Sequence, residues 1–372
     1  MKKHERSRNN SFYDNFNETK CLKCLKSEIP FVCYYNSFIG TCHSSNEDFV
    51  SVHKNIFRHS NWPDSHFFSI FDGHGGSSCG KFLKENFFSV LKRNKNFPKF
   101  PIKSLNKTFA EIERDFFEKH KPNNLLSKLE LSGSCAIVLL MIGKKFYVAN
   151  LGDSKMVKSA KFSVCDLNRQ HKPNLEKNRI EKNGGKVFES KNIFRISPGK
   201  LSVSRSFGDL NAKLKEFGGN QNVLISKPEI FVYNFDKNDV DFIVIGSDGL
   251  MDFVDEEEIG KIVWKNHKNK ENICKILIEK SIENGSKDNI SCIFIAFENF
   301  LNFEGEVKNV KKEENKFVDK NKYDFNVEYN IKKNNIFYNN KNNVAKNTSY
   351  ENYKNSVKEY KKILNNNNKN NN

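Results

Sequence analysis

Acidic residues lie beside the ends of several apolar runs in this sequence of 372 residues. In the clearest case the apolar run of residues 67–71 ends at Asp72, which opens the sequence DGHGG and so stands two residues before His74. An apolar run that ends in glycines is typical of a buried strand leading into a tight loop, where glycine lets the backbone approach a ligand closely. Taken alone, Asp72 and His74 also fit a turn aspartate and a loop histidine. Other acids near the ends of apolar runs are Glu47, Asp48, Asp153, Asp248, Asp252 and Asp288.

Carboxylates gathered at one place repel one another and lose hydration, so a fold that gathers them normally holds cations between them. Oxygen ligands without histidine or cysteine at ligand spacing favour hard cations such as Mg²⁺ or Mn²⁺. Two such ions can clamp a phosphoryl group and lower the pKa of a bridging water, which would give phosphoester hydrolysis. The spacing does not show that these loops converge, because tens of residues separate them.

Several elements are expected to position these acids. The run of residues 67–71 predicts a buried strand, and Leu83, Phe87 and Leu91 have helical spacing. Two apolar runs on either side of the turn 143–144 predict a hairpin that ends near Asp153. Further elements are a strand over 242–245, a helix after the capping pair Asp255 and Glu258, a helix around 271–284 and a strand after Asp288.

Composition excludes several classes of protein. A hydrophobic content of 37% is enough for a sizeable core, and no window reaches the length of about 18 apolar residues that a membrane span needs. The formal charge of +17 suggests acidic partners, but no basic stripe interleaved with aromatic residues indicates nucleic acid. The nine scattered cysteines fit reduced thiols, and the single CxxC pair, Cys21 and Cys24, is weak evidence for zinc. We expect a monomer in the cytoplasm or nucleus.

The composition predicts three segments. About 30% of residues 301–372 are asparagine, which predicts an Asn/Lys-rich disordered tail, and residues 1–28 are expected to form a polar N-terminal extension. The folded domain is expected over 29–300.

A series of motifs occurs in one order along the chain: NED, FDGHGG, SGSCA, VANLGDSK, QHKP, GKLSVSRSFGD, KPEI, GSDGLMD and GSKDNIS. From about residue 30 to residue 300 this series resembles the metal-dependent protein phosphatases of the protein phosphatase 2C (PPM) family. The resemblance implies an α+β fold, a four-layer αββα sandwich of two antiparallel β-sheets flanked by helices, with two metal ions at one edge.

The resemblance also assigns metal ligands. Asp72 would bridge both ions, the Gly73 carbonyl would support one of them, and Asp248 and Asp288 would bind the other. Glu47 and Asp48 would hold water molecules on the metals.

Other residues receive roles next to the metals. His74 would be the general acid that protonates the leaving seryl or threonyl oxygen. Asp153 and Asp252 would either bind a third, weaker ion or support the other ligands from outside. Residues 199–209, with the segment to about residue 228, match a flap beside the cleft, in which Arg205 is expected to anchor the flap.

Four positions depart from the family pattern, and none is an expected metal ligand. His43 stands where the family usually has an arginine that grips the substrate phosphate, so His43 is a candidate phosphate-binding residue with a weaker, pH-dependent charge. The other three departures are Cys135 for threonine, Gln170 for aspartate and Met251 for tryptophan.

The resemblance therefore implies a Mg²⁺- or Mn²⁺-dependent serine/threonine protein phosphatase that hydrolyses phosphoproteins with metal-activated water. A phosphoprotein-binding scaffold that keeps the fold but turns over little is the competing hypothesis, because the phosphate grip at His43 is altered. A phosphatase that acts on small phosphoesters is a third hypothesis.

Overall fold

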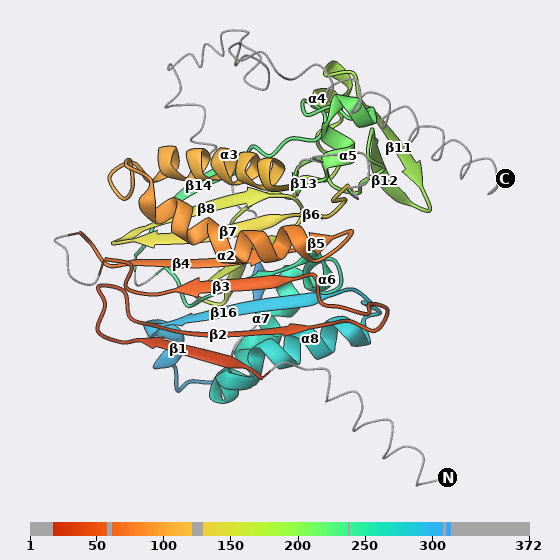
Figure 1. Ribbon diagram of the computed structural model, residues 1–372. Coiled ribbons are helices and arrows are strands. Elements are labelled where there is room, and N and C mark those ends of the chain that lie inside the picture. Colours follow the sequence, from red (N-terminus) through yellow and green to blue (C-terminus); the bar gives the residue numbers. More distant parts are fainter. Residues whose placement is uncertain (1–17, 58–61, 121–128, 237–238, 308–309, 314–372) are drawn as a thin grey trace, which may run out of the picture.

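The computed structural model describes residues 18–57, 62–120, 129–236, 239–307 and 310–313. Two β-sheets form its centre (Figure 1). The seven-stranded sheet has, in spatial order, β1 (Lys20–Cys24), β2 (Phe31–Phe38), β16 (Ile290–Phe297), β15 (Phe242–Gly246), β9 (Lys155–Ala160), β10 (Ser163–Asp166) and β17 (Lys311–Lys312). The five-stranded sheet has β14 (Glu229–Asn234), β8 (Lys145–Leu151), β7 (Ala136–Ile142), β4 (Ser65–Phe71) and β3 (Phe49–His53). All pairings within these sheets are antiparallel except that of β10 with β17.

The central strands are buried on both faces, which explains their continuous apolar runs. In β4, Phe68 and Ile70 face the opposite sheet and join a cluster that also holds Ile243 and Ile293. The alternate residue Phe67 lies in a second cluster with the helices. Because side chains alternate between the two faces of a strand, β4 contributes both to the core between the sheets and to the core under the helices.

Helices cover the outer face of each sheet. On the five-stranded sheet these are α2 (Ser78–Arg93) and α3 (Pro101–His120), and on the seven-stranded sheet α7 (Glu256–Lys265) and α8 (Ile273–Glu283) (Figure 1). The order helix, sheet, sheet, helix confirms the predicted α+β sandwich of four layers. The predicted cap is also present, because the Asp255 side chain accepts a hydrogen bond from the Glu258 backbone N–H. Among the described residues, no helix combines the length and the apolar character needed to cross a membrane.

The seven-stranded sheet extends past both predicted domain boundaries. Strand β1 lies within the segment 1–28 and pairs with β2 from Lys20 opposite Tyr35 to Cys24 opposite Phe31. At the other end β17 pairs with β10, and the Lys312 ammonium donates a 2.8 Å hydrogen bond to Glu256. The expected boundaries at 29 and 300 therefore fall inside the sheet. Residues 1–17 and 314–372, which hold the rest of the predicted extension and tail, lie outside the described residues.

A smaller unit projects beside the five-stranded sheet (Figure 1). It has α4 (Lys177–Lys182), a hairpin of β11 (Lys186–Ser190) and β12 (Ile193–Ser197), and α5 (Leu210–Lys213). We call residues 176–228 the flap. Its small apolar core holds Ile180, Ile196, Ala212, Val223 and Leu224.

Two ion pairs fix the flap. The Arg205 guanidinium donates to both carboxylate oxygens of Glu176, with an Nη2–Oε1 distance of 2.5 Å, so Arg205 anchors the flap as predicted. The buried Lys213 ammonium pairs with Glu113 of α3 at 2.5 Å. Burial raises the pKa of Glu176, but hydrogen bonds from Arg205 and Arg179 and the charge of Arg205 bring it well below its usual value.

The C-terminal part of the sheet gives a first prediction. A chain that ends at residue 300 lacks Phe303, which packs against Trp264, and Val310, which is 7% exposed and lies against Gly260. We expect it to be less stable than a chain that ends at residue 313 by about 3 kcal/mol or more, since burial of each large apolar side chain contributes roughly 1.5–3 kcal/mol. Urea denaturation of the two truncated chains measures the difference. Equal free energies of unfolding would show that this segment does not pack on the domain.

The Glu176 ion pair gives a pH prediction. The folded-state pKa of Glu176 lies below its usual value of 4.5, so the carboxylate stabilises the fold above that pH and loses this effect as the pH falls. Glu176→Gln should cost about 3–5 kcal/mol at pH 7, because Arg205 is left without its partner. The difference in free energy of unfolding between wild type and variant should shrink by about 1.4 kcal/mol at pH 3.5. Urea denaturation of both proteins at the two pH values tests this, and a gap that stays constant would contradict the assignment.

Candidate active site

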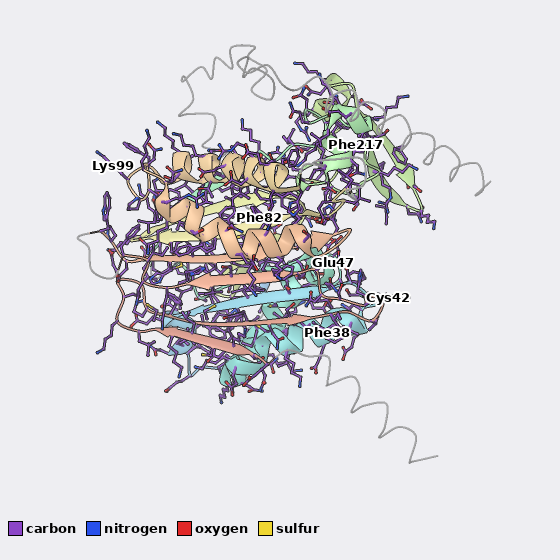
Figure 2. The ribbon with its side chains drawn as sticks, viewed as in Figure 1. Phe38, Cys42, Glu47, Phe82, Lys99 and Phe217 are labelled. Carbon is purple, nitrogen blue, oxygen red and sulfur yellow. The ribbon has the colours of Figure 1, made fainter. Side chains whose placement is uncertain are left out.

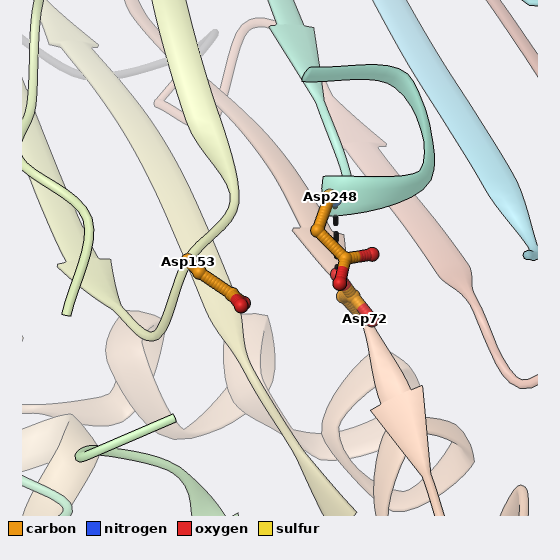
Figure 3. A group of neighbouring side chains, drawn as sticks. All are labelled: Asp72, Asp153 and Asp248. Atoms are coloured by element: carbon orange, nitrogen blue, oxygen red, sulfur yellow. Dashed lines mark hydrogen bonds between the residues drawn. The ribbon is translucent and has the colours of Figure 1, made fainter. Parts of the chain in front are cut away.

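Three acids from different parts of the chain meet where the two sheets adjoin. Asp72 follows β4, Asp153 follows β8, and Asp248 opens the short helix α6 (Asp248–Met251) after β15. Carboxylate oxygens of the three residues all lie within 4.8 Å of one another (Figure 3). Because β4 and β8 belong to one sheet and β15 to the other, the face-to-face packing of the sheets creates this cluster.

Backbone hydrogen bonds hold Asp72 at the centre of the cluster. Its carbonyl oxygen accepts from the Cys135 N–H at 2.8 Å. Its carboxylate accepts from the Asp248 N–H at 3.3 Å, which Figure 3 shows as a dashed line. The segment at Cys135 therefore holds the backbone of Asp72, and the start of α6 holds its carboxylate.

The cluster carries strong electrostatic strain. Burial and then the neighbouring charges, first that of Asp248, raise the pKa of Asp72 well above its usual value. The pKa of Asp248 is raised well above its usual value by burial and by Asp153, and that of Asp153 is raised by burial and by Asp252. Cations between the carboxylates would relieve this repulsion.

A fourth acid, Asp48, lies buried behind the cluster. Its side chain is 6% exposed, and its Oδ2 has no hydrogen-bond partner among the described residues. Burial raises the pKa of Asp48 to about 7, although the neighbouring hydroxyls of Ser291 and Ser247 oppose the shift. A buried oxygen without a partner and a donor set made only of oxygens both fit a hard divalent cation with its water molecules.

Glu47 reaches the site from the loop before β3. Its carboxylate accepts from the Gly76 N–H at 3.0 Å, and its own N–H donates to the Asn289 side chain at 2.7 Å. Residue 73 must be glycine here, because a Cβ atom would lie 2.3 Å from the Glu47 carbonyl oxygen. Figure 2 shows Glu47 at the same end of the sandwich as Cys42, the neighbour of His43.

His43 and Asp288 form a pair at the rim. The His43 Nε2 lies 3.0 Å from Asp288 Oδ1, and the two side chains are 41% and 49% exposed. Backbone hydrogen bonds from Thr41 and Cys42 to the Lys287 carbonyl hold the two loops together. The predicted phosphate-binding residue is thus in contact with a predicted metal ligand.

His74 pairs with an acid from the flap. Its Nε2 lies 2.9 Å and 3.0 Å from the two carboxylate oxygens of Asp209, which is 3% exposed and also accepts from the Ser206 hydroxyl at 2.6 Å. Burial lowers the pKa of His74, but the charge and hydrogen bond of Asp209 outweigh it, and the net shift is upward. A Cβ atom at Gly133 would lie 2.1 Å from Asp209 and 2.4 Å from His74, so only glycine leaves room for the pair.

Asp209 was not among the site residues predicted from the sequence. The signal available was an acid at the end of the flap motif GKLSVSRSFGD. A small sheet brings it to His74, because β6 (Gly133–Ser134) pairs on one side with β5 (Gly73–His74) and on the other with β13 (Phe207–Gly208). This order of pairing has no local sequence signal.

Asp153 and Asp252 are neighbours with different surroundings. Asp153 lies in the acidic cluster, whereas Asp252 is exposed and pairs with the Lys172 ammonium at 2.8 Å and 2.9 Å. Two of the family departures contact Asp153: the Cys135 thiol donates to its carboxylate, and the Gln170 amide donates to its backbone carbonyl. Met251, another of these departures, is buried.

A cavity of about 360 Å³ joins these groups. Its lining includes the acidic cluster, His43, Glu47, His74 and Asp288 on the domain side. The flap contributes Arg195, Gly199, Leu201, Ser202, Val203 and Asp209. The cavity therefore lies between the edge of the sandwich and the flap, and neither Asp252 nor Arg205 lines it.

Comparisons with known proteins agree with this architecture. The protein phosphatase 2C family model matches residues 37–290. The rice (Oryza sativa subsp. japonica) protein "Probable protein phosphatase 2C 52" is 34% identical over 278 residues, which cover 73% of this chain and 52% of the rice protein. The chain thus spans about half the length of that relative. The Paramecium tetraurelia protein "Probable protein phosphatase 2C 6" is 33% identical over 253 residues, which cover 63% of this chain and 84% of that protein.

A solved structure shares the fold. The crystal structure of serine-threonine phosphatase 2C from Toxoplasma gondii superposes with a TM-score of 0.59 at 18% identity, covering 76% of this chain and 99% of that one. The family match covers most of the sandwich and every residue of the acidic cluster. The chain therefore belongs to the protein phosphatase 2C family.

Proposed function

We propose that this protein is a metal-dependent serine/threonine protein phosphatase. The observation that carries the proposal is the convergence of Asp72, Asp153 and Asp248 on one cavity with the His74–Asp209 pair. Acids that can hold divalent cations and a histidine paired with a buried carboxylate are groups that suit phosphoester hydrolysis. Family membership supports the same conclusion.

The acids at the cavity would hold Mg²⁺ or Mn²⁺. Asp72, the Gly73 carbonyl, Asp248 and Asp288 would hold the ions, and Glu47 and Asp48 would support them. Asp153 lies close enough to the same cluster to take part in a third site. When bound, the ions would neutralise the clustered carboxylates and supply a Lewis acid for the attack of water on phosphorus.

His74 would supply the proton that the reaction needs. Hydrolysis forms a bond between phosphorus and a water oxygen and breaks the bond to the seryl or threonyl oxygen, which must then be protonated. His74 faces the cavity, and the charge of Asp209 favours its protonated form. Asp209 also fixes the ring orientation, because both of its oxygens lie within hydrogen-bond distance of Nε2.

Substrate phosphate would meet cationic groups on two sides of the cavity. His43 lies on the domain side, and Arg195 reaches the cavity from β12, where its Nη1 donates to the Lys200 carbonyl at 2.9 Å. The guanidinium of Arg195 can donate two parallel hydrogen bonds to a phosphate, which the imidazole of His43 cannot. Phosphorylated proteins are the substrates that this arrangement suits, and the free thiols of the described residues support an intracellular location.

A phosphoprotein-binding scaffold is the second candidate. The His43–Asp288 contact favours it, because that contact occupies the side chain expected to grip phosphate. Mn²⁺-dependent hydrolysis of p-nitrophenyl phosphate separates the two functions: turnover supports the enzyme, and its absence from a folded protein supports the scaffold.

Asp248→Asn tests the metal assignment. The variant should lose turnover of p-nitrophenyl phosphate by a factor of about 100 or more, since a charged ligand is lost. Its thermal stability without metal should equal or exceed that of the wild type, because one source of repulsion is removed. Asp239→Asn is the control, because this exposed acid pairs with Lys161 and does not line the cavity, so its loss should leave turnover unchanged. Wild-type turnover by the Asp248 variant would refute the assignment.

His43→Arg tests the phosphate contact. Arginine would restore a permanent charge and a bidentate donor, so the inhibition constant for inorganic phosphate should fall about tenfold or more if the contact is direct, since such a contact contributes roughly 1.5–3 kcal/mol. Inhibition of p-nitrophenyl phosphate hydrolysis by inorganic phosphate, compared between wild type and variant, measures this. An unchanged constant would mean that residue 43 does not face the phosphate.

A further inference from the structure

The flap hairpin has a defined geometry. Strands β11 and β12 are joined by Lys191 and Asn192 alone, with φ angles of 52° and 62°. Two successive residues with positive φ form the type I′ turn that matches the twist of a two-residue hairpin. The register is therefore fixed, with Phe188 opposite Arg195 and Ser190 opposite Ile193.

The two faces of this hairpin have different neighbours. Val187 and Ile196, which are paired in the register, pack into the small core of the flap. Side chains alternate along a strand, so Phe188, Ile193 and Arg195 share the opposite face. Arg195 lines the catalytic cavity. The hairpin face that presents Arg195 to the cavity therefore also carries Phe188 and Ile193.

Both apolar residues on this face are exposed. Phe188 is 37% exposed and Ile193 is 46% exposed. Directly opposed side chains of an antiparallel pair have Cβ atoms about 5 Å apart, which places the Phe188 ring beside Arg195. Phe188 and Ile193 are diagonal neighbours on this face, and adjoining apolar side chains that stay exposed mark a binding surface more often than scattered ones.

The surroundings indicate which ligand this surface suits. Residues 181–200 carry five cationic side chains and two carboxylates, so the flap favours an anionic partner. Ile193 lies two strand positions from Arg195, which is roughly 7 Å, and an extended peptide spans that distance in about two residues. A peptide whose phosphorylated residue enters the cavity would thus bring a neighbouring side chain to this surface.

We propose that Phe188 and Ile193 form a subsite for an apolar side chain of the phosphoprotein substrate, two or three residues from the phosphorylated serine or threonine. The proposal rests on the proposed function, since it assumes that the phosphorylated residue enters the cavity. It adds a sequence preference: substrates with a large aliphatic or aromatic residue at this distance are bound more tightly than substrates with a polar one.

Phosphothreonine peptides test the subsite directly. One set carries leucine and the other serine at the second and third positions on either side of the phosphothreonine. For wild type, kcat/KM should be about five- to tenfold higher for the best leucine peptide, mainly through KM. The double variant Phe188→Ser, Ile193→Ser should lose this preference and keep wild-type turnover of p-nitrophenyl phosphate. Phosphonate analogues, which are not hydrolysed, give the affinity of each peptide by fluorescence anisotropy.

Phe194→Ser is the matched control. Phe194 is 41% exposed on the same hairpin, but it lies opposite Glu189 on the other face, so its loss should leave the leucine preference intact. An equal loss of preference in this control would assign the effect to the hairpin as a whole and overturn the subsite. Self-association of the wild type that the double variant abolishes would assign the face to a second copy of the chain, which also overturns it.

The two proposals fail separately. A wild type that hydrolyses p-nitrophenyl phosphate with Mn²⁺ but treats leucine and serine peptides alike contradicts the subsite alone. A wild type without hydrolysis that still binds the leucine phosphonate more tightly contradicts the enzymatic function alone.

Discussion

Repulsion among the carboxylates of Asp72, Asp153 and Asp248, of which Asp153 is buried and the others half-buried, is the constraint that the surrounding structure has to satisfy. Their oxygens lie within 4.8 Å of one another, and burial together with their mutual charge raises the pKa of each. Such a cluster persists only if the scaffold that holds it is stiff. Two sheets packed face to face supply that stiffness, because β4, β8 and β15 are each paired on both sides and buried on both faces.

The flap is held to the same scaffold by charges that are fully paired. Arg205 and Glu176 fix it from within, and Lys213 and Glu113 fix it to α3. Asp209 then reaches His74 across the small sheet at a position where Gly133 leaves room for both side chains. His74 and the acidic cluster thus share one cavity.

Local patterns predicted much of this structure, and long-range pairing explains most of what they did not. The buried strands, the 143–144 hairpin and the Asp255 cap were predicted because each depends on neighbours in sequence. The convergence of Asp72 and Asp248 could be inferred only from the family resemblance, since 176 residues separate them. Strand β1 is mostly exposed and β17 has only two residues, so neither has an apolar pattern in the sequence. Each forms because it pairs with the edge of a longer strand, β2 or β10. Asp209 has no local signal either, because its partner His74 lies 135 residues away.

The proposed roles of the residues around the cavity all depend on the claim that the acidic cluster is a site for divalent cations. Isothermal titration calorimetry of the purified protein with Mn²⁺ at pH 7.5 tests this claim without any substrate. We expect binding of at least two ions per chain, and loss of both high-affinity sites in Asp72→Asn, since Asp72 lies in the acidic cluster and accepts a hydrogen bond from Asp248. Absence of Mn²⁺ binding, or binding that Asp72→Asn leaves unchanged, would contradict it.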